Sequence, residues 1–316
     1  MWFTTVLMAI KIAKRAKVKF DVFIGEFYVG AICGPILRRM GMVKKIIYWD
    51  SDWFPYQPRK KVKFFTYIAN SVLFPYLDRF SAKRADLIWN FNQRIIEARH
   101  SRWNSGQLRI AKEEPMPPPL TPRRTKVGLP KRDGQEKVGF LGVLRPGQGV
   151  ELGIEAIANL KKQNINVSLE IIGTSSYEQY LKNYAEKLGV PDRVIFNGFV
   201  KEEKKVEEIL QGCTCALALF QGGKENYTYY TWPSKVGFYL ECGVPVLITK
   251  STAVAEDVRE KKMGIVVESN LESVSRAIKT LVSSPGLYEE YSQNAIKYVQ
   301  KRASGKDLTD SIERLI

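Results

Sequence analysis

The chain has 316 residues, with 49 Lys and Arg against 33 Asp and Glu, so its formal net charge is +16. Forty-five per cent of the residues are apolar, which is enough to fill a hydrophobic core and excludes global disorder. The single histidine, His100, and four cysteines without a C-x-x-C pair exclude the usual zinc sites, and no apolar run is long enough to predict a transmembrane helix.

The charge is spread unevenly over a length that suits about two domains. Residues 1–135 hold 26 basic and 10 acidic residues, whereas residues 136–316 hold 23 of each. We therefore expect one domain over 1–135 and a second over 136–316. The segment 113–124 contains five prolines, which disfavour regular structure, so it is predicted to be the linker between them.

In the first half, helical and strand patterns alternate. Apolar helical stretches over 4–16, 28–40 and 61–82 each precede a short apolar run that is typical of a buried parallel strand. A nucleotide-binding half of this kind usually begins with a strand and a glycine-rich turn, whereas this one begins with a helix. We therefore expect a shortened first domain or a misassigned start of the chain. The strands are predicted at residues 22–25, 45–49 and 86–89.

The second half shows six strand patterns separated by helices, which predicts a doubly wound parallel sheet. Ligands bind beyond the carboxyl ends of the strands in such sheets. The last helices, over 269–283 and 285–302, could cross back to the first domain. The strands are predicted at residues 138–141, 168–172, 193–196, 215–219, 245–248 and 264–267, with helices at 150–162, 177–188, 202–211, 234–242 and 253–260.

A glycine-rich loop from Gly142 to Gly149 follows the first of these six strands and opens a helix. Glycines let the backbone approach an anion, and the helix N-terminus supplies unpaired N–H groups. Arg145 in this loop could pair with a phosphate. The loop is not a Walker loop, because the G-K-[ST] motif is absent. The alternative to phosphate binding is a tight turn between the strand and the helix, without a ligand.

A second candidate for anion binding is Pro233-Ser234-Lys235. Proline suits a helix start, so Ser234 and Lys235 would lie in the first turn, where backbone N–H groups, a hydroxyl and an ammonium can converge on one anion. A lysine there opposes the helix dipole, and an anionic partner would explain it. A solvated lysine is the alternative.

The motifs of the second half resemble, in order and spacing, the nucleotide-sugar domain of GT-B glycosyltransferases, especially the retaining group called glycosyltransferase family 4. The resemblance implies an α/β fold of the GT-B type, with two Rossmann-like domains whose parallel sheets face a cleft. The first half matches only loosely, as the later part of an acceptor-binding domain. The matching features are G-x-L-x-x-x-x-G-V at 142–150, I-I-G at 171–173, V-x-F-x-G-x-V at 194–200, P-S-K at 233–235 and C-G-V-P-V-L at 242–247.

The chain departs from the family pattern at four positions. Val143 and Gln148 stand where the phosphate loop usually carries basic residues, and Tyr230 and Phe238 stand where two glutamates are common. The second of those glutamates usually binds the donor ribose. Glu241, three residues after Phe238 and close to the same helix face, is the candidate to replace it.

By resemblance, the protein would transfer a sugar from a nucleoside diphosphate sugar, with retention and without a metal or another cofactor. Arg145 and Lys235 would stabilise the charge that develops on the leaving diphosphate. The backbone near Phe199 and Val200 would face the base. The remaining donor-binding candidates are Gly142, Gln148, Gly149, Thr174, Ser234 and Glu241.

The acceptor would be a sugar, a glycan or a lipid-linked molecule. Glu26, Asp50 and Asp52 follow predicted strands of the first half, where carboxylates could bind sugar hydroxyls or act as a base, with helix caps as the alternative. The basic segment 59–63, followed by the apolar and aromatic segment 64–74, suits an anionic membrane surface, and a packed helix with a solvated basic end is the alternative. The membrane hypothesis predicts a cytoplasmic protein at the inner face of the membrane. No nucleic-acid-binding motif accompanies the charge, so nucleic acid is not an expected partner.

Two other functions stay open. A degenerate transferase that binds nucleotide or a partner without turnover would fit the four departures and the short first domain. A nucleotide-sugar epimerase on the same fold would be expected to have more acid and base residues and more than one histidine.

Overall fold

The chain folds into two compact units that do not follow each other simply along the sequence. The computed structural model describes residues 2–58, 60, 63–103, 110–124 and 136–316. Unit 1 is assembled from three segments, Met1–Pro118, Gly222–Trp232 and Gly305–Ile316, and unit 2 from two, Pro119–Gln221 and Pro233–Ser304. A single boundary near residue 135 therefore does not describe the division, because two later segments belong to unit 1. Residues 125–135, which contain that boundary, lie outside the described residues.

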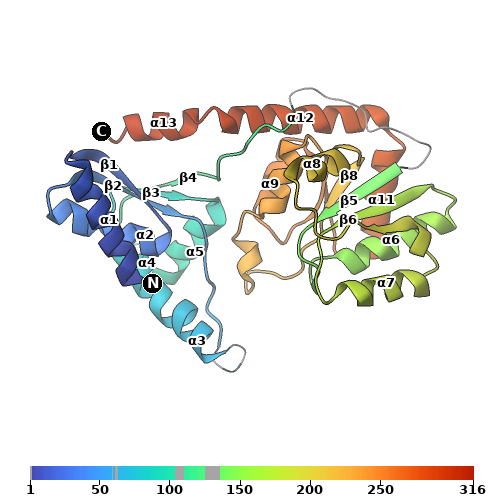
Figure 1. The fold of residues 1–316 in the computed structure, drawn as a ribbon, viewed down its shortest axis with the longest axis horizontal. Coiled ribbons are helices and arrows are strands. Elements are labelled where there is room, and N and C mark those ends of the chain that lie inside the picture. The colour runs from blue at the N-terminus through green and yellow to red at the C-terminus, as the bar shows by residue number, and fades with distance from the viewer. Residues whose placement is uncertain (1, 59, 61–62, 104–109, 125–135) are drawn as a thin grey trace. The chain divides into compact units, whose positions relative to one another are not determined.

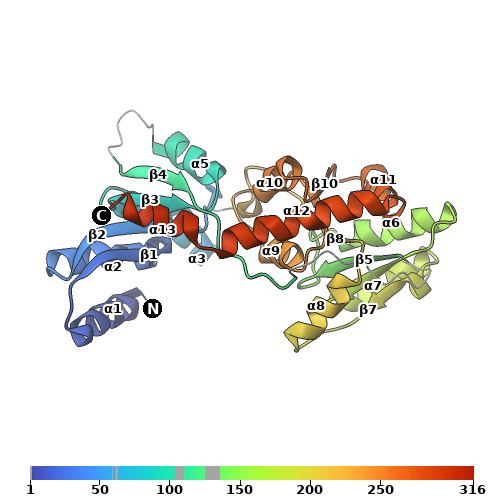
Figure 2. The ribbon, with the colours of Figure 1, turned by 90° about the horizontal axis from the view of Figure 1, so that it is seen from above.

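Unit 1 is built on a parallel sheet of four strands in chain order, β1 (Phe20–Glu26), β2 (Val43–Asp50), β3 (Leu87–Asn90) and β4 (Lys112–Pro115). Its helical segments are α1 (Trp2–Ala16), α2 (Phe27–Arg39), α3 (Phe64–Tyr67), the π-helix η2 (Ile68–Leu73), α4 (Phe74–Ala82), α5 (Gln93–Trp103) and α13 (Lys306–Glu313). Helices α2 and α4 lie on one side of the sheet and α13 on the other (Figures 1 and 2). On the α13 side, Leu308 and Ile312 pack against Trp89, whose indole Nε1 donates a hydrogen bond to the Ser311 hydroxyl at 2.9 Å.

The strand β4 corrects the expectation that 113–124 is an irregular linker. β4 pairs in parallel with β3, with Glu113 opposite Ile88 and Pro115 opposite Asn90. It is an edge strand, and its proline is the last residue of the strand, so the missing N–H group costs no ladder hydrogen bond. The prolines therefore end the strand instead of preventing it, and only residues 116–124 of the predicted linker carry no strand or helix.

Unit 2 has the predicted doubly wound parallel sheet, in the strand order β10-β9-β8-β5-β6-β7. The strands are β5 (Glu136–Leu141), β6 (Val167–Ile172), β7 (Val194–Phe196), β8 (Cys215–Ala218), β9 (Val246–Thr249) and β10 (Gly264–Val267). The longer helices are α6 (Val150–Lys162), α7 (Glu178–Lys187), α8 (Glu203–Gln211), α9 (Ser234–Glu241), α10 (Val254–Glu260), α11 (Leu271–Val282) and α12 (Pro285–Ala303), with short 3-10 turns η3 (Pro191–Arg193) and, in the segment that belongs to unit 1, η4 (Tyr227–Tyr229).

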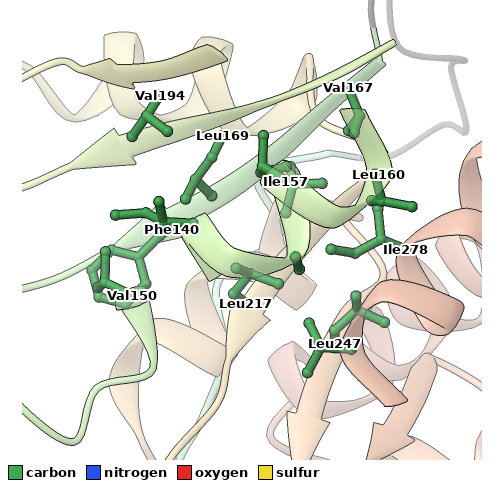
Figure 3. Close-up of a cluster of buried hydrophobic side chains, with 14 of the residues drawn as sticks. Phe140, Val150, Ile157, Leu160, Val167, Leu169, Val194, Leu217, Leu247 and Ile278 are labelled. Carbon is green, nitrogen blue, oxygen red and sulfur yellow. The ribbon is translucent and has the colours of Figure 1, made fainter. Parts of the chain in front are cut away.

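The core of unit 2 explains why its elements were readable from sequence. In α6, apolar residues at positions 150, 154, 157 and 160 fall on one face, and that face is fully buried against the sheet. Figure 3 shows Ile157 and Leu160 of α6 among side chains from neighbouring strands, with Ile278 of α11 beside them. Helix α11 starts where Asn270 accepts a hydrogen bond from the Ser273 amide at 2.9 Å, an N-cap that stabilises a helix by about 1 kcal/mol.

One buried guanidinium links three strands of unit 1. Arg99 of α5 is fully buried and forms ion pairs with Asp50 at the end of β2 and with Glu113 in β4. It also donates to Asn90 at the end of β3, at 2.7 Å, and pairs with Asp78 of α4 at 3.0 Å. Three carboxylates share one guanidinium, and burial accordingly raises the pKa of Asp50 to about 8, with Arg99 opposing and Asp78 adding to this shift.

We predict that Arg99→Leu lowers the free energy of unfolding of unit 1 by about 3–5 kcal/mol, because it leaves buried carboxylates without a cation. All six tryptophans lie in segments of unit 1, so tryptophan fluorescence during urea unfolding reports this unit selectively. A loss below about 1 kcal/mol would show that the cluster is not a main source of its stability.

The raised pKa of Asp50 adds a pH dependence with a defined sign. The folded state binds a proton that the unfolded carboxyl, with a pKa near 4, does not bind at neutral pH, so stability is lost as pH rises toward 8. Asp50→Asn carries no titratable group and should flatten this loss between pH 5 and pH 8. The Asp50→Asn variant thereby separates the effect of the proton from the effect of losing the cation in Arg99→Leu.

Candidate functional site

A pocket of about 450 Å³ opens at the carboxyl edge of the sheet in unit 2. It is formed where β5 ends at Leu141 and where α9 begins at Ser234. Five of the residues that the sequence assigned to donor binding or catalysis lie in its wall. The lining residues are Leu141, Gly142, Val143, Arg145, Gln148, Ser234, Lys235 and Phe238.

Close backbone contacts bring the loops after β5, β6 and β7 together at this edge. The Gly142 amide donates to the Ile172 carbonyl at 2.9 Å, and the Gly173 amide donates to the Gly198 carbonyl at 2.8 Å. Gly173 has a φ of +136°, and a Cβ atom there would lie only 2.0 Å from the Gly142 carbonyl oxygen. Glycine is therefore required at Gly173 for the loops to meet.

The outer members of the predicted donor set lie on these same loops, outside the pocket wall. Thr174 follows Gly173 and donates its hydroxyl hydrogen to Glu178 at 2.8 Å. Phe199 follows Gly198 with 77% of its surface exposed, and Val200 comes next. Gly149 caps α6 at a φ of +78° and packs so closely on Leu219 that a Cβ would lie 2.4 Å from the Leu219 Cβ. The close packing on Leu219 is therefore sufficient to explain why a glycine stands at position 149.

Lys235 is the most unusual group in the pocket. Its ammonium lies 4.2 Å from the ring centre of Phe140 and 5.1 Å from that of Phe220, and it donates to Gln148 Oε1 at 2.8 Å. Burial, together with the nearby charge of Arg145, lowers the pKa of Lys235 to about 7. Among the residues that the structure describes, no carboxylate forms an ion pair with this ammonium. An anion entering the pocket would supply the missing countercharge.

Glu241, expected to bind the donor, has another task and does not line the pocket. Its carboxylate accepts hydrogen bonds from Arg123 Nε at 2.7 Å and from the Thr121 amide at 2.8 Å. Arg123 also pairs with Glu203 and Glu207, each at 2.6 Å, and so holds the chain where it enters unit 2. The spacing in the sequence placed Glu241 close to the helix face of Phe238. It could not show that the Glu241 carboxylate binds Arg123.

The three acceptor-side carboxylates separate into two groups in unit 1. Asp50 is fully buried and pairs with Arg99, so its expected contact with acceptor hydroxyls is replaced by a role in the interior. Glu26 is exposed at the end of β1, and Asp52 is half-buried in the loop after β2. Burial raises the pKa of Asp52, and the charge of Glu26 adds to the shift, so these two carboxylates lie near each other at the carboxyl edge of this sheet.

Two features of the site could not be recognised from spacing. The aromatic rings of Phe140 and Phe220 that enclose Lys235 lie in or after strands, where they read as ordinary core residues. The aromatic stretch 225–232 belongs to unit 1, and nothing in its local sequence indicates this. Within the described ranges, no helix is long and apolar enough to cross a membrane, and no cluster of His, Cys, Asp and Glu is arranged to hold a metal ion.

Taken with the pocket, the two parallel-sheet units define a protein of the GT-B glycosyltransferase fold, and solved structures support this class. HepE from Anabaena, solved with UDP, matches with a TM-score of 0.69 at 15% identity, over 97% of this chain and 82% of HepE. WaaG, described as a glycosyltransferase involved in lipopolysaccharide biosynthesis, matches with a TM-score of 0.58 at 17% identity, over 84% of this chain and 75% of WaaG. The expected α/β fold with two parallel sheets is thereby confirmed.

Residues 123–298, more than half of the chain, match the family described as glycosyl transferases group 1, and the chain belongs to this family. A GDP-mannose-dependent α-(1-6)-phosphatidylinositol monomannoside mannosyltransferase of Mycolicibacterium smegmatis is 27% identical over 151 residues, 46% of this chain and 38% of the relative. An uncharacterised glycosyltransferase of Methanocaldococcus jannaschii is 24% identical over 184 residues, 57% of this chain and 44% of the relative. The chain thus spans less than half the length of these two curated relatives.

We predict that Gly173→Ala lowers the free energy of unfolding of unit 2 by about 1–3 kcal/mol more than Gly147→Ala. Both glycines have positive φ angles, but a Cβ at Gly147 meets no atom within 4 Å, whereas one at Gly173 meets the Gly142 carbonyl. The matched pair therefore isolates the steric contact from the backbone preference. Circular dichroism during thermal unfolding measures it, and equal losses would contradict the contact.

Proposed function

We propose that the protein is a glycosyltransferase that uses a nucleoside diphosphate sugar and binds the diphosphate of this donor in the pocket of unit 2. The observation that carries the proposal is Lys235, a buried ammonium without a carboxylate partner in the described part of the chain. Arg145 stands in the same pocket wall, and α9 begins at Ser234, so its first backbone N–H groups face the same region. Two cations and a helix N-terminus suit a diphosphate.

In the proposed mechanism, the pocket stabilises the leaving group. As the bond between the sugar and the diphosphate breaks, negative charge grows on the diphosphate, and Lys235 and Arg145 hold positive charge beside it. Because Lys235 is enclosed by Phe140 and Phe220, its interaction with that charge is weakly screened by water. These groups supply the charge stabilisation that a metal ion provides in other transferases, so we propose metal-independent transfer, with retention as in the family that the sequence resembles.

The acceptor is proposed to approach the carboxyl edge of unit 1. Glu26 and Asp52 lie near each other there, and a carboxylate with a raised pKa is suited to accept a proton from a hydroxyl. The names of relatives guide the choice of substrates: one is GDP-mannose-dependent and acts on a phosphatidylinositol mannoside, and HepE has been solved with UDP-glucose. GDP-mannose and UDP-glucose are therefore the first donors to test, with lipid-linked and glycan acceptors.

A second function, nucleotide binding without turnover, is favoured by Phe238. This aromatic residue lies in the pocket wall, and Glu241, the candidate to compensate for it, is bound to Arg123. The two functions differ in one measurement. A transferase consumes the donor when an acceptor is present, and NMR of the product gives the anomeric configuration, whereas a degenerate protein binds the donor and leaves it intact.

We predict that Lys235→Ala and Arg145→Ala each lower the rate of transfer about 100-fold or more while the fold is retained, because each removes a cation that acts on the leaving diphosphate. Nucleotide release is the measurement. Lys182→Ala, on α7 and outside the pocket wall, is the control and should keep its activity. Full activity in both pocket variants would refute the proposed phosphate site.

We also propose that unit 1 docks on an anionic membrane surface. Phe65 of α3 is 84% exposed, and Lys60 and Lys63 lie just before this helix. Apolar side chains are likewise exposed on α1, which ends with Lys14 and Arg15. Basic residues beside exposed apolar ones suit the interface of an anionic bilayer. Arg59 and Lys61 of the predicted basic segment lie outside the described residues.

Replacing Lys60, Lys61 and Lys63 by Gln should weaken binding to vesicles that contain phosphatidylglycerol roughly 100-fold, at about 1 kcal/mol for each lysine near the surface. Cosedimentation measures it. The control replaces three exposed lysines of unit 2, Lys201, Lys204 and Lys205, by Gln, which removes the same charge. Equal losses in both triple variants would indicate a general effect of net charge instead of a docking surface.

A further inference from the structure

The side chain of Lys235 lies in a narrow space within unit 2. Its ammonium lies beside the rings of Phe140, in β5, and Phe220, just after β8, and both belong to the same unit as Lys235. A Cβ atom at Gly142 would lie only 3.2 Å from the Lys235 Nζ atom. The absence of a side chain at Gly142 therefore leaves room for the lysine to reach the end of β5.

The groups around this nitrogen do not favour its protonated form. The Nζ atom donates to the Gln148 amide oxygen at 2.8 Å, and this amide is neutral. The elements packed against it contribute the rings of Phe140 and Phe220 and, among the described residues, one charged group, Arg145 in the loop after β5. Burial and the repulsion by Arg145 lower the pKa of Lys235 to about 7. Without an anion in the pocket, roughly half of the Lys235 side chains are therefore neutral amines at pH 7.

A neutral lysine is a nucleophile, whereas an ammonium is not. A solvated lysine, with its ordinary pKa near 10.4, holds on the order of a thousandfold less neutral amine at pH 7 than Lys235 does. Desolvation by an apolar pocket and a neighbouring cation both activate lysines in proteins, and Lys235 has both. Arg145 and Ser234 in the same pocket wall suit a phosphate group. The pocket thus places a nucleophile beside groups that bind a phosphate-bearing electrophile.

We propose that Lys235 is a modification site, which acyl phosphates acylate when the pocket holds no donor. The neutral Nζ atom attacks the carbonyl carbon, so that a nitrogen–carbon bond forms while the bond between this carbon and the phosphate oxygen breaks. The phosphate leaves with the electron pair of the broken bond, beside Arg145 and Ser234, and the nitrogen releases one proton to solvent. The products are an amide and inorganic phosphate, and the step needs no oxidant or reductant.

The modification would switch off the pocket. An acylated Lys235 carries no positive charge and has lost the cation that faces the diphosphate of the donor. In the opposite direction, a bound diphosphate stabilises the ammonium and occupies the place of the acyl phosphate, so it protects Lys235. This regulatory consequence rests on the proposed donor-binding function, whereas the acylation itself rests on the pocket alone.

The test uses acetyl phosphate and the full chain. The wild type is incubated with the reagent between pH 6 and pH 10, and mass spectrometry of peptides gives the acetylation rate of each lysine. At pH 7, Lys235 should react at least 100-fold faster than Lys201 and Lys204, which are exposed on unit 2. Its rate should level off above pH 8, where the amine is neutral, while the rates of the exposed lysines rise up to pH 10. A Lys235 that reacts no faster than these two lysines would overturn the inference.

The part played by the phosphate group is tested with an electrophile that lacks one, the N-hydroxysuccinimide ester of acetic acid. Arg145→Gln should slow the reaction of Lys235 with acetyl phosphate about tenfold relative to its reaction with the ester. Both reagents meet the same amine, so the ratio of the two rates cancels any change in the pKa of Lys235. Lys182→Gln, on α7 and outside the pocket wall, removes the same charge and should leave the ratio unchanged. A ratio that does not change in Arg145→Gln would overturn the assignment of acyl phosphates.

Donor binding distinguishes this inference from the proposed function. Calorimetry with UDP-glucose and GDP-mannose should show affinity at least tenfold weaker after acetylation of Lys235, and a bound donor should slow the acetylation. A protein that binds neither donor but is acetylated selectively at Lys235 would refute the donor function and keep the modification site. A protein that binds a donor, while its Lys235 reacts no faster than Lys201, would keep the donor function and refute the modification site. A bound donor that leaves the acetylation rate unchanged would refute the regulatory link.

Discussion

A buried positive charge that the described protein does not neutralise is the constraint around which the proposed donor site is built. Lys235 is enclosed by two aromatic rings and is partnered by the neutral amide of Gln148. Keeping an ammonium in such a place costs free energy, which its lowered pKa reflects. The glycine loops around it, with Gly173 against Gly142, hold the backbone close to the place where an anion would sit. The buried ammonium is thus electrostatically unfavourable by itself, and an anion in the pocket would relieve this cost.

Unit 1 handles charge at the equivalent edge of its sheet in the opposite way. There a single guanidinium, Arg99, is shared by Asp50, Asp78 and Glu113, so the interior holds more carboxylates than cations. A proton compensates part of this surplus, because burial raises the pKa of Asp50. Among the described residues, the sheet of unit 2 therefore has an ammonium without a carboxylate partner at its carboxyl edge. The sheet of unit 1 has more buried carboxylates than cations near its carboxyl edge. A donor with a diphosphate and an acceptor with hydroxyl groups suit these two edges respectively.

The sequence predicted the fold of unit 2 nearly residue by residue, because its buried helices and strands carry one clear period each, as in the apolar face of α6. It also brought Gly142, Arg145, Gln148, Ser234 and Lys235 to one pocket, since motifs at the ends of parallel strands must converge. The predictions from the sequence failed where contacts between residues far apart in the chain determine the structure. Glu241 forms an ion pair with Arg123 and does not line the pocket, and Asp50 is buried in an ion pair with Arg99. The strand β4 forms despite Pro115, because an edge strand tolerates a proline. None of these outcomes has a local signal.

The assembly of unit 1 from three chain segments has a consequence for how the protein is made. Residues 1–118 are synthesised before residues 222–316, so the Trp89 indole finds its partner Ser311 only when α13 has been made, and the aromatic cluster around Phe74 is completed only by Tyr230. The longest segment of unit 1 is thus translated before the two segments that complete the unit. Until then its apolar sheet face and aromatic cluster stay uncovered, so co-translational binding by a chaperone would act chiefly on unit 1. A cut between residues 118 and 119 would leave the first fragment without two segments of unit 1, whereas the second fragment would hold all of unit 2.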